Sequence, residues 1–234
     1  QESRGLGDVY KRQKSALLAG STGLIGKCCL NILLKNNVYD KIIIPVRKKS
    51  ENENKKLFQL IINYDKISDF KNEMKADDIF CCLGTTMKKA GSKEEFYKVD
   101  FNYVYNLAKL CKNNGAKTFS LIYSVGADQN SGKFYIKVKG EIEDAVIKLG
   151  YETTNIFRPS FLAGDRSESR PGEKAGIFIM KLFAPLLQGP LKKYRAIDAE
   201  TVAEVMVKAA QYKNNPVNIF PSDMINKIYT ENIY

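Results

Sequence analysis

Three side chains at a regular spacing indicate proton transfer without histidine. Ser124 ends a short apolar run, Tyr135 follows eleven positions later, and Lys139 follows after four more. A spacing of four puts Tyr135 and Lys139 on one face of a helix. A lysine ammonium stabilises a nearby phenolate, so Tyr135 is predicted to be a general acid or base on a substrate oxygen that Ser124 binds. An exposed tyrosine beside a solvated lysine is the alternative, because a Y-x-x-x-K match alone is common.

A glycine-rich turn follows the first predicted strand. Gly20, Gly23 and Gly26 fit the pattern G-x-x-G-x-x-G, between an apolar run and a helical pattern. The first glycine permits a tight turn, the second lets backbone N–H groups approach a pyrophosphate, and the third lets the helix pack on the strand. The positive end of the helix dipole adds to this attraction. The order of strand, glycine-rich turn and helix predicts dinucleotide binding. The alternative is a tight turn that binds no ligand.

Cations at the end of the second predicted strand indicate which dinucleotide is bound. Arg47 and Lys48 stand where an NAD site usually has a carboxylate for the ribose 2′-hydroxyl. A guanidinium can instead pair with a 2′-phosphate. The sequence therefore favours NADP(H) over NAD(H), with a solvated basic loop as the alternative.

Two further strand ends are predicted to contact the cofactor. Leu83, Gly84 and Thr85 lie at the end of the fourth strand and form a small step across which adenosine can lie. Arg158 and Pro159 end the sixth strand, where proline makes the turn rigid and the backbone faces the nicotinamide carboxamide. Tyr135 and Lys139 are also predicted to bind the cofactor, and Lys139 in particular to hold the nicotinamide ribose. The alternatives are that Gly84 only permits a turn and that Pro159 only ends the strand.

The elements that must position these residues alternate along the chain. Helical spacing separates several short apolar runs, which implies parallel strands joined by right-handed crossovers. The fold class is therefore α/β, a Rossmann-type doubly wound parallel sheet with a small C-terminal substrate-side region. Buried strands are expected at 16–19, 41–46, 57–62, 78–83, 118–123 and 153–157, a last short strand at 217–220, and helical patterns at 24–33, 96–110, 142–149 and 199–211.

The length of 234 residues suits one such domain, expected at 15–234. Residues 1–14 are polar and without period, and are expected to be extraneous or disordered. Substrate-side loops and a helix are expected at 157–195. Within them, residues 165–173 are dense in both signs of charge, which fits either a substrate lid or an internally paired surface loop.

Composition excludes several classes of site. The chain has no histidine, which excludes a Ser-His-Asp triad, a Cys-His dyad and imidazole metal sites, so no metal is expected. The net charge of +11 favours anionic ligands, but the cations are scattered and no nucleic-acid recognition motif is present. No apolar run reaches the ~20 residues that a membrane span needs. Five cysteines, four of them in adjacent pairs within apolar runs, predict buried thiols and a cytoplasmic location.

Several segments together resemble the atypical short-chain dehydrogenases/reductases, and more narrowly the Tat-interacting-protein-type oxidoreductases. The resemblance covers residues 15 to about 210, and CCLGTT and DRSESRPGE are its most distinctive parts. The matching segments are AGSTGLIGK at 19–27, PVRKK at 45–49, FCCLGTTMKKAG at 80–91, KVDFNYV at 98–104, SVGAD at 124–128, YIKVKGEIE at 135–143 and FRPSFLAGDRSESRPGE at 157–173.

The resemblance implies a Rossmann-type domain that binds NADPH, with the same catalytic set of serine, tyrosine and lysine. It implies a cofactor site in which the pyrophosphate is lined by Gly20, Ser21, Thr22, Gly23, Leu24, Ile25 and Gly26, the 2′-phosphate by Arg47 and Lys48, the adenosine by Leu83, Gly84 and Thr85, and the nicotinamide side by Arg158 and Pro159. One position departs from the family pattern: Asn63, with Asp65 nearby, stands where relatives often have an acid after the third strand. Asp100 stands where much of the superfamily has an asparagine, but the animal relatives also have an acid there, so it is interpreted as a trait of this branch.

Two functions fit these features. The first is NADPH-dependent reduction of a carbonyl-type small molecule, supported by the intact Ser124, Tyr135 and Lys139. The second is an NADPH-sensing regulatory module that binds protein partners, since animal members of the resembling family are described as regulators. Substrate identity, hydride stereochemistry and oligomeric state are not given by the sequence.

Overall fold

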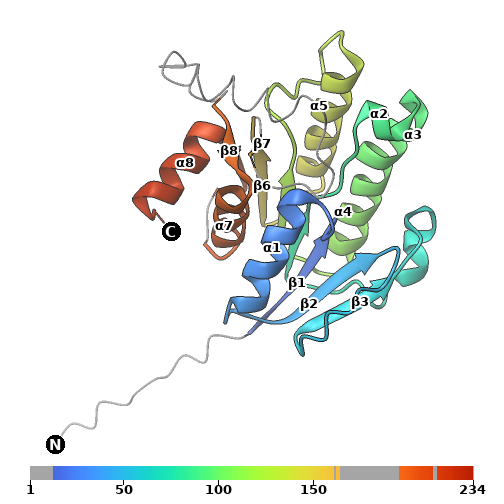
Figure 1. The fold of residues 1–234 in the computed structure, drawn as a ribbon. Helices are drawn as coiled ribbons and strands as arrows, with labels where there is room; N and C mark the ends of the chain where they lie inside the picture. Colours follow the sequence, from blue (N-terminus) through green and yellow to red (C-terminus); the bar gives the residue numbers. More distant parts are fainter. Residues whose placement is uncertain (1–12, 161, 164–194, 213–214, 234) are drawn as a thin grey trace, which may run out of the picture.

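A seven-stranded parallel sheet forms the centre of the computed structural model (Figure 1). The structure describes residues 13–160, 162–163, 195–212 and 215–233. Most of the predicted N-terminal segment, the 165–173 loop and most of the substrate-side region lie outside the described residues. The strand order is β3-β2-β1-β4-β5-β6-β9, and every neighbouring pair is parallel.

The strand order reverses at the middle of this sheet. β1 (Lys14–Ala19) pairs with β2 (Tyr39–Val46) on one side and with β4 (Asp78–Cys81) on the other. The chain runs outward from there in both directions, which leaves a crevice at the carboxyl ends of β1 and β4. The remaining strands are β3 (Leu57–Ile61), β5 (Thr118–Ile122), β6 (Thr153–Arg158) and β9 (Val217–Pro221). The predicted doubly wound Rossmann-type sheet is confirmed.

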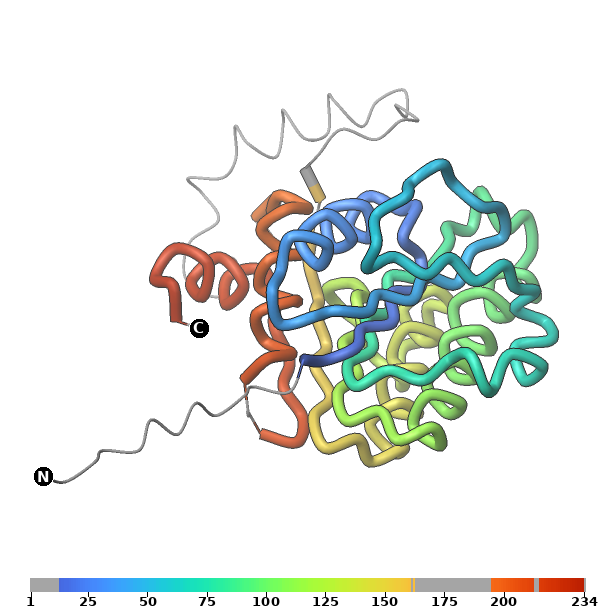
Figure 2. The backbone as a smooth tube through the Cα atoms, turned by 90° about the horizontal axis from the view of Figure 1, so that it is seen from below, coloured from blue at the N-terminus to red at the C-terminus, as the bar shows by residue number. Residues whose placement is uncertain are grey.

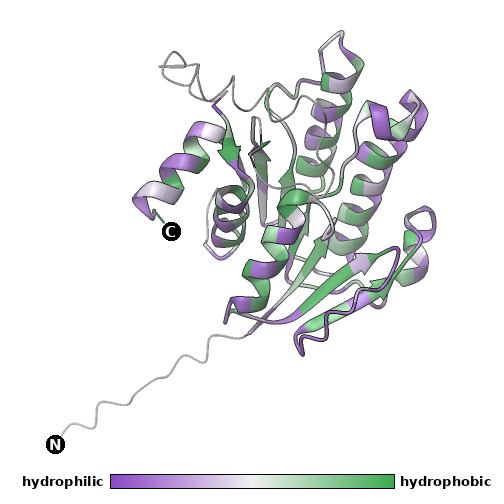
Figure 3. Cartoon of the chain, viewed as in Figure 1, coloured by the Kyte–Doolittle hydropathy of each residue, from purple (hydrophilic) through white to green (hydrophobic). Residues whose placement is uncertain are grey.

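Helices cover both faces of the sheet, and Figure 3 shows their apolar sides turned inward. α1 (Leu24–Lys35) and α7 (Ala199–Ala209) pack with Leu18 in one hydrophobic cluster. α4 (Val104–Asn113) and α5 (Phe134–Ile147) pack with Leu17 in another. Successive strand residues point to opposite faces, so a strand covered on both sides needs an unbroken apolar run such as that of β1.

The predicted 96–110 helix is interrupted. α2 (Met87–Ala90) and α3 (Lys93–Tyr97) lead into a π-helical segment, η2 (Lys98–Tyr103), before α4 begins. A π-helical turn replaces the regular backbone hydrogen bonds of the α-helix and often occurs at functional sites. Here the carbonyl of Asp100 accepts a hydrogen bond from the Tyr123 hydroxyl at 2.6 Å. The Tyr123 hydroxyl is thus a hydrogen-bond partner for the backbone of η2, and helical spacing in the sequence does not predict this contact.

The burial predicted for the third strand is wrong. Phe58 and Ile61 on β3 are 50% and 56% exposed, because β3 is an edge strand. Strands four and five also end before the predicted Leu83 and Tyr123. Short elements that the patterns did not predict are η1 (Tyr64–Phe70), the parallel pair β7 (Leu162–Ala163) and β8 (Ile197–Asp198), and α8 (Ser222–Glu231). Figure 2 shows α7 and α8 at one end of the molecule and the β3 region at the other.

Close packing at Gly140 sets the position of α5. A Cβ atom there would lie 2.1 Å from the Gln129 nitrogen and 2.4 Å from the Asp128 carbonyl carbon. Gly140→Ala is therefore expected to lower the free energy of unfolding by roughly 1–3 kcal/mol, as overpacking does. Chemical denaturation measures this, with Gly132→Ala as control, since its Cβ meets nothing within 4 Å. Equal stability of the two variants would contradict the packing argument.

Candidate active site

A cleft of about 490 Å³ opens at the carboxyl ends of β1, β4 and β5. Its lining comes from the glycine loop and the start of α1, from the segment after β4, from the end of β5, and from α5 and β7. Lining residues are 22–27, 82–86, Lys89, Ile122, Tyr123, Lys139 and Leu162. The cleft at the reversal of strand order is therefore lined by two of the predicted cofactor segments, the glycine loop and the step after the fourth strand.

The glycine loop forms the first wall. Gly20 adopts a φ of +81°, and the Gly23 N–H donates to its carbonyl at 3.0 Å. A Cβ at Gly20 would lie 2.4 Å from the Cys82 carbonyl oxygen, and one at Gly26 would lie 2.0 Å from the Gly20 oxygen. Both glycines are therefore needed for close backbone approach. Of the neighbouring predicted residues, Ser21 is buried, whereas Thr22, Gly23, Leu24, Ile25 and Gly26 line the cleft.

The N-terminus of α1 is suited to an anionic ligand. Its N-cap is Gly23, which has no side chain to cap the helix, and its first turn has no acidic residue. The first backbone N–H groups of a helix need partners from elsewhere, and a pyrophosphate supplies them. The uncapped helix and the backbone cradle fit a dinucleotide.

The second wall is the step after β4. Leu83, Gly84 and Thr85 line the cleft as predicted. The Thr85 N–H donates to the Asp100 Oδ2 atom at 2.8 Å. A Cβ at Gly84 would lie 3.4 Å from Asp100 Oδ1 and 3.9 Å from the Lys139 Nζ atom. This step therefore packs directly on an ion pair.

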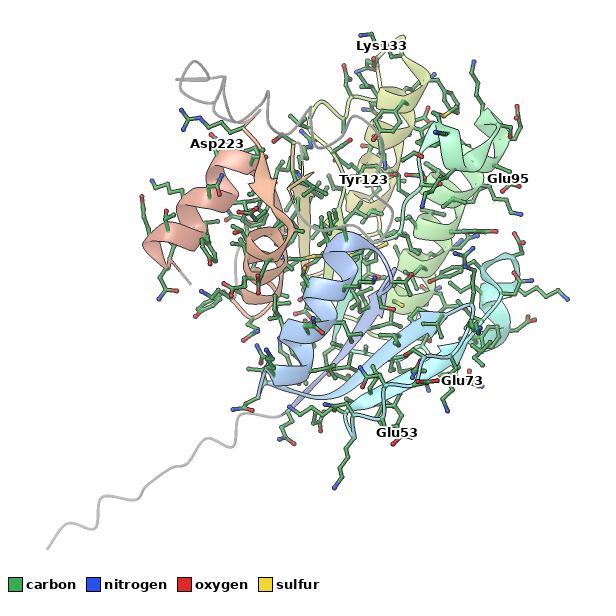
Figure 4. All side chains as sticks on the ribbon, in the orientation of Figure 1. Glu53, Glu73, Glu95, Tyr123, Lys133 and Asp223 are labelled. Carbon is green, nitrogen blue, oxygen red and sulfur yellow. The ribbon has the colours of Figure 1, made fainter. Side chains whose placement is uncertain are left out.

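That ion pair joins Lys139 to Asp100. The two side chains are 6% and 0% exposed, and Nζ lies 2.6 Å from Oδ1. The ammonium also lies 3.7 Å from the ring centre of Tyr123 and 5.6 Å from that of Tyr135. Both are cation–π distances. Figure 4 labels Tyr123 near the middle of the molecule. Desolvation raises the pKa of the Asp100 carboxyl, and the charge of Lys139 opposes that rise.

The three predicted catalytic residues lie at one end of the sheet. α5 places Tyr135 one turn before Lys139, and Tyr135 is 39% exposed. Ser124 follows Tyr123 just beyond β5 and is half-buried. Lys139 lines the cleft, whereas Ser124 and Tyr135 lie outside its lining. The structure thus brings Lys139 to the glycine loop and keeps Tyr135 beside Lys139.

The side chain of Arg158 forms an ion pair with Glu143. Its Nε atom donates to both carboxylate oxygens of Glu143, at 3.1 and 3.0 Å, and its Nη2 atom also pairs with Oε2. Desolvation raises the pKa of this carboxyl and the ion pair with Arg158 opposes the rise. The Pro159 carbonyl accepts from the Val125 N–H at 3.1 Å. Neither Arg158 nor Pro159 lines the cleft.

The predicted 2′-phosphate cations are exposed. Arg47 and Lys48 follow β2, whose end lies beside the end of β1. Asp65, the acidic residue after the third strand, forms contacts with two other side chains. Asp65 pairs with Lys98 at 2.9 Å and accepts from the Tyr103 hydroxyl at 2.9 Å, and these hydrogen bonds lower its pKa.

Several lining residues were not predicted, among them Lys27 and Lys89, which face the cleft from the two walls. Lys27 directly follows the last glycine, a position that could have been read from the sequence. Asp100, Tyr123 and Glu143 were not assigned to the site either. Their roles depend on contacts between segments far apart in the sequence.

Comparison with known proteins agrees with this architecture. Residues 16–221 match the NAD dependent epimerase/dehydratase family. Protein HTATIP2 of Rattus norvegicus is 38% identical over 170 residues, 71% of this chain and 70% of that protein. Protein FMP52, mitochondrial, of Candida albicans is 35% identical over 207 residues, 84% of this chain and 88% of that protein.

Solved structures share the fold at low identity. The Bordetella bronchiseptica enzyme WbmH in complex with NAD+ superposes with a TM-score of 0.65 at 15% identity, covering 93% of this chain and 80% of that chain. The ADP-L-glycero-D-manno-heptose-6-epimerase of Helicobacter pylori gives 0.66 at 14%, covering 96% and 84%. None of the helices in the described ranges has both the length and the apolar character of a membrane span. The chain belongs to the NAD dependent epimerase/dehydratase family and, within it, to the Tat-interacting-protein-type oxidoreductases that its motifs resemble.

Proposed function

We propose that this protein is an NADPH-dependent oxidoreductase that reduces a carbonyl-type small molecule through Ser124, Tyr135 and Lys139. The observation that carries the proposal is the position of the Lys139 ammonium. It lies in the cleft that the glycine loop lines, and one helical turn from Tyr135. This arrangement supports two roles for Lys139, as a ligand of the cofactor and as the cation that stabilises the Tyr135 phenolate.

The roles of the three residues follow from their chemistry. When bound, NADPH supplies a hydride to the carbonyl carbon. Ser124 donates a hydrogen bond to the carbonyl oxygen and orients it. Tyr135 gives its hydroxyl proton to the same oxygen as negative charge develops there. Lys139 stabilises the phenolate that remains.

Preference for NADPH is tested by nicotinamide fluorescence titration with NADPH and NADH. Arg47→Ala is expected to weaken NADPH binding by about tenfold to a hundredfold, since a charge-assisted hydrogen bond to the 2′-phosphate is lost. NADH binding should be nearly unchanged. Lys55→Ala, which removes another exposed cation from the segment between β2 and β3, is the control. Equal losses with both nucleotides would contradict the role of Arg47, and absence of NADPH binding by the wild-type protein would overturn the proposed function.

We infer a cytoplasmic location from the thiols. All five cysteines are free, and Cys29, Cys81 and Cys111 are buried, as expected in a reducing compartment. The fungal relatives carry the word mitochondrial in their names. Microscopy of the tagged protein tests this location, and a mitochondrial signal would contradict it.

A further inference from the structure

The connection between β2 and β3 contains no helix. Residues 47–56 join these two parallel strands, whereas such crossovers are usually longer and helical. Residues 47–55 are exposed, and Figure 4 labels Glu53 among them. A hollow of about 480 Å³ is lined by residues 49–54 of the crossover and residues 57–59 of β3. The crossover therefore has neither the internal hydrogen bonds of a helix nor close packing on the sheet.

One side chain of β3 binds the backbone of this crossover. The Oε1 atom of the half-buried Gln59 accepts from the Ser50 N–H at 2.8 Å and from the Ser50 hydroxyl at 3.0 Å. Its Nε2 atom donates to the Ser50 carbonyl at 2.8 Å and to the Asn52 carbonyl at 3.2 Å. In the described part of the chain, the hydrogen bonds that residues 47–53 form with other elements all end on Gln59.

These hydrogen bonds fix the chain just beyond the cations that are predicted to bind the 2′-phosphate. Arg47 and Lys48 lie between the buried Val46, which ends β2, and Ser50, which Gln59 holds. Both cations therefore belong to a short bridge between two fixed points. A bridge of this length restricts where their backbone can lie, although their side chains are exposed.

Without Gln59 the bridge would be much longer. The next residue of the crossover that is bound to β3 is Asn54, whose carbonyl accepts from the Leu57 N–H at 2.9 Å. The whole segment 47–53 would then be free to move between the two strands. Each residue released in this way gains backbone conformational entropy, which must be lost again when the segment closes on a ligand.

We propose that Gln59 is a positioning residue for cofactor specificity, whose amide holds the crossover so that Arg47 and Lys48 remain at the 2′-phosphate of NADPH. The inference rests on the proposed function, since it concerns the same cofactor. A segment that is ordered before binding loses less entropy on binding, and the ligand gains affinity. NADH has no 2′-phosphate, so this gain applies to NADPH alone.

An amide is the functional group that fits this position. Ser50 presents its N–H and hydroxyl as donors and its carbonyl as an acceptor, and Asn52 presents a second carbonyl. A glutamine side chain has both an acceptor oxygen and an NH₂ group, whereas a glutamate carboxylate has acceptors only. A methionine of similar length has neither strong donor nor strong acceptor. Gln59→Met therefore removes the four hydrogen bonds and keeps most of the side-chain volume.

The test is cofactor discrimination, measured as the ratio of the dissociation constants of NADH and NADPH in fluorescence titrations. Gln59→Met is expected to weaken NADPH binding about threefold to tenfold, equivalent to roughly one net hydrogen bond, and to leave NADH binding unchanged. Calorimetric titration with adenosine 2′,5′-bisphosphate and adenosine 5′-monophosphate should show the same difference, because the 2′-phosphate distinguishes these two ligands. A merely structural role for Gln59 would change the binding of all four ligands alike.

A double-mutant cycle shows whether Gln59 acts through the two cations. In a protein that carries both Arg47→Ala and Lys48→Ala, Gln59→Met should have no further effect on NADPH affinity, because the groups that it positions are absent. A ratio that stays at the wild-type value in Gln59→Met, or a loss of NADPH affinity that persists in full without the two cations, would overturn the inference. Either result would leave the proposed function standing.

Gln211→Met is the matched control. Gln211 is also half-buried, and its Nε2 atom donates to the Val207 carbonyl of α7 at 3.2 Å, but it does not line the cleft. Its replacement should leave the NADH to NADPH ratio unchanged. If Gln59→Met aggregates through the exposed edge strand, Gln59→Thr replaces it, since threonine favours strands and is too short to reach Ser50. If the wild-type protein binds NADPH no more tightly than NADH, the NADPH preference of the proposed function fails, and this inference with it.

Discussion

Tyr135→Phe is expected to lower the turnover of a carbonyl compound by about a hundredfold to ten-thousandfold, the range that general acid catalysis contributes. The substitution removes one oxygen and leaves the ring. The ring contact with Phe96, at 5.4 Å between centroids, should therefore persist. NADPH affinity should change little, because Lys139 and the glycine loop are untouched. The loss is measured as NADPH oxidation at saturating cofactor, with a carbonyl compound that the wild-type protein reduces.

The control is Tyr229→Phe, which removes the hydroxyl of an exposed tyrosine on α8. It should retain full activity. Unchanged turnover in Tyr135→Phe would exclude this tyrosine as the proton donor. A protein that binds NADPH but reduces none of a broad panel of carbonyl compounds would instead favour the regulatory module.

Gly26→Ala is expected to abolish useful NADPH binding and to destabilise the protein. The added Cβ would lie 2.0 Å from the Gly20 carbonyl oxygen and 2.8 Å from its carbonyl carbon. Both are backbone atoms of the cofactor loop, so the loop or α1 must move. Overpacking of this kind costs roughly 1–3 kcal/mol or more, and a displaced loop no longer directs its N–H groups at the pyrophosphate.

Gly91→Ala separates this steric effect from a backbone effect. Gly91 has a φ of +78°, but a Cβ there meets nothing within 4 Å. It should cost some stability through backbone strain and leave NADPH affinity intact. Denaturation and titration on the same preparations give both quantities. Wild-type affinity in Gly26→Ala would show that the loop does not hold the pyrophosphate as proposed.

Local patterns were sufficient for most of the architecture. The unbroken apolar run of β1 could be read as a strand covered on both faces, and Gly20, Gly23 and Gly26 as a tight βα turn, because periodicity and glycine sterics act over a few residues. The same patterns failed at β3, where an apolar strand lies at a sheet edge. Edge position depends on the order of all strands, which no local window contains.

The sequence by itself determined the fold class, the glycine loop and the helix face that carries Tyr135 and Lys139. Only the tertiary structure decided what surrounds that lysine. The Asp100 carboxylate comes from the π-helical segment η2 and the Tyr123 ring from the residue after β5, and Asp100 is 39 positions from Lys139. Spacing along a helix is set by local backbone geometry. Contacts across the sheet are instead selected by the packing of the whole core, so the charge balance of the site became visible only once the chain was folded.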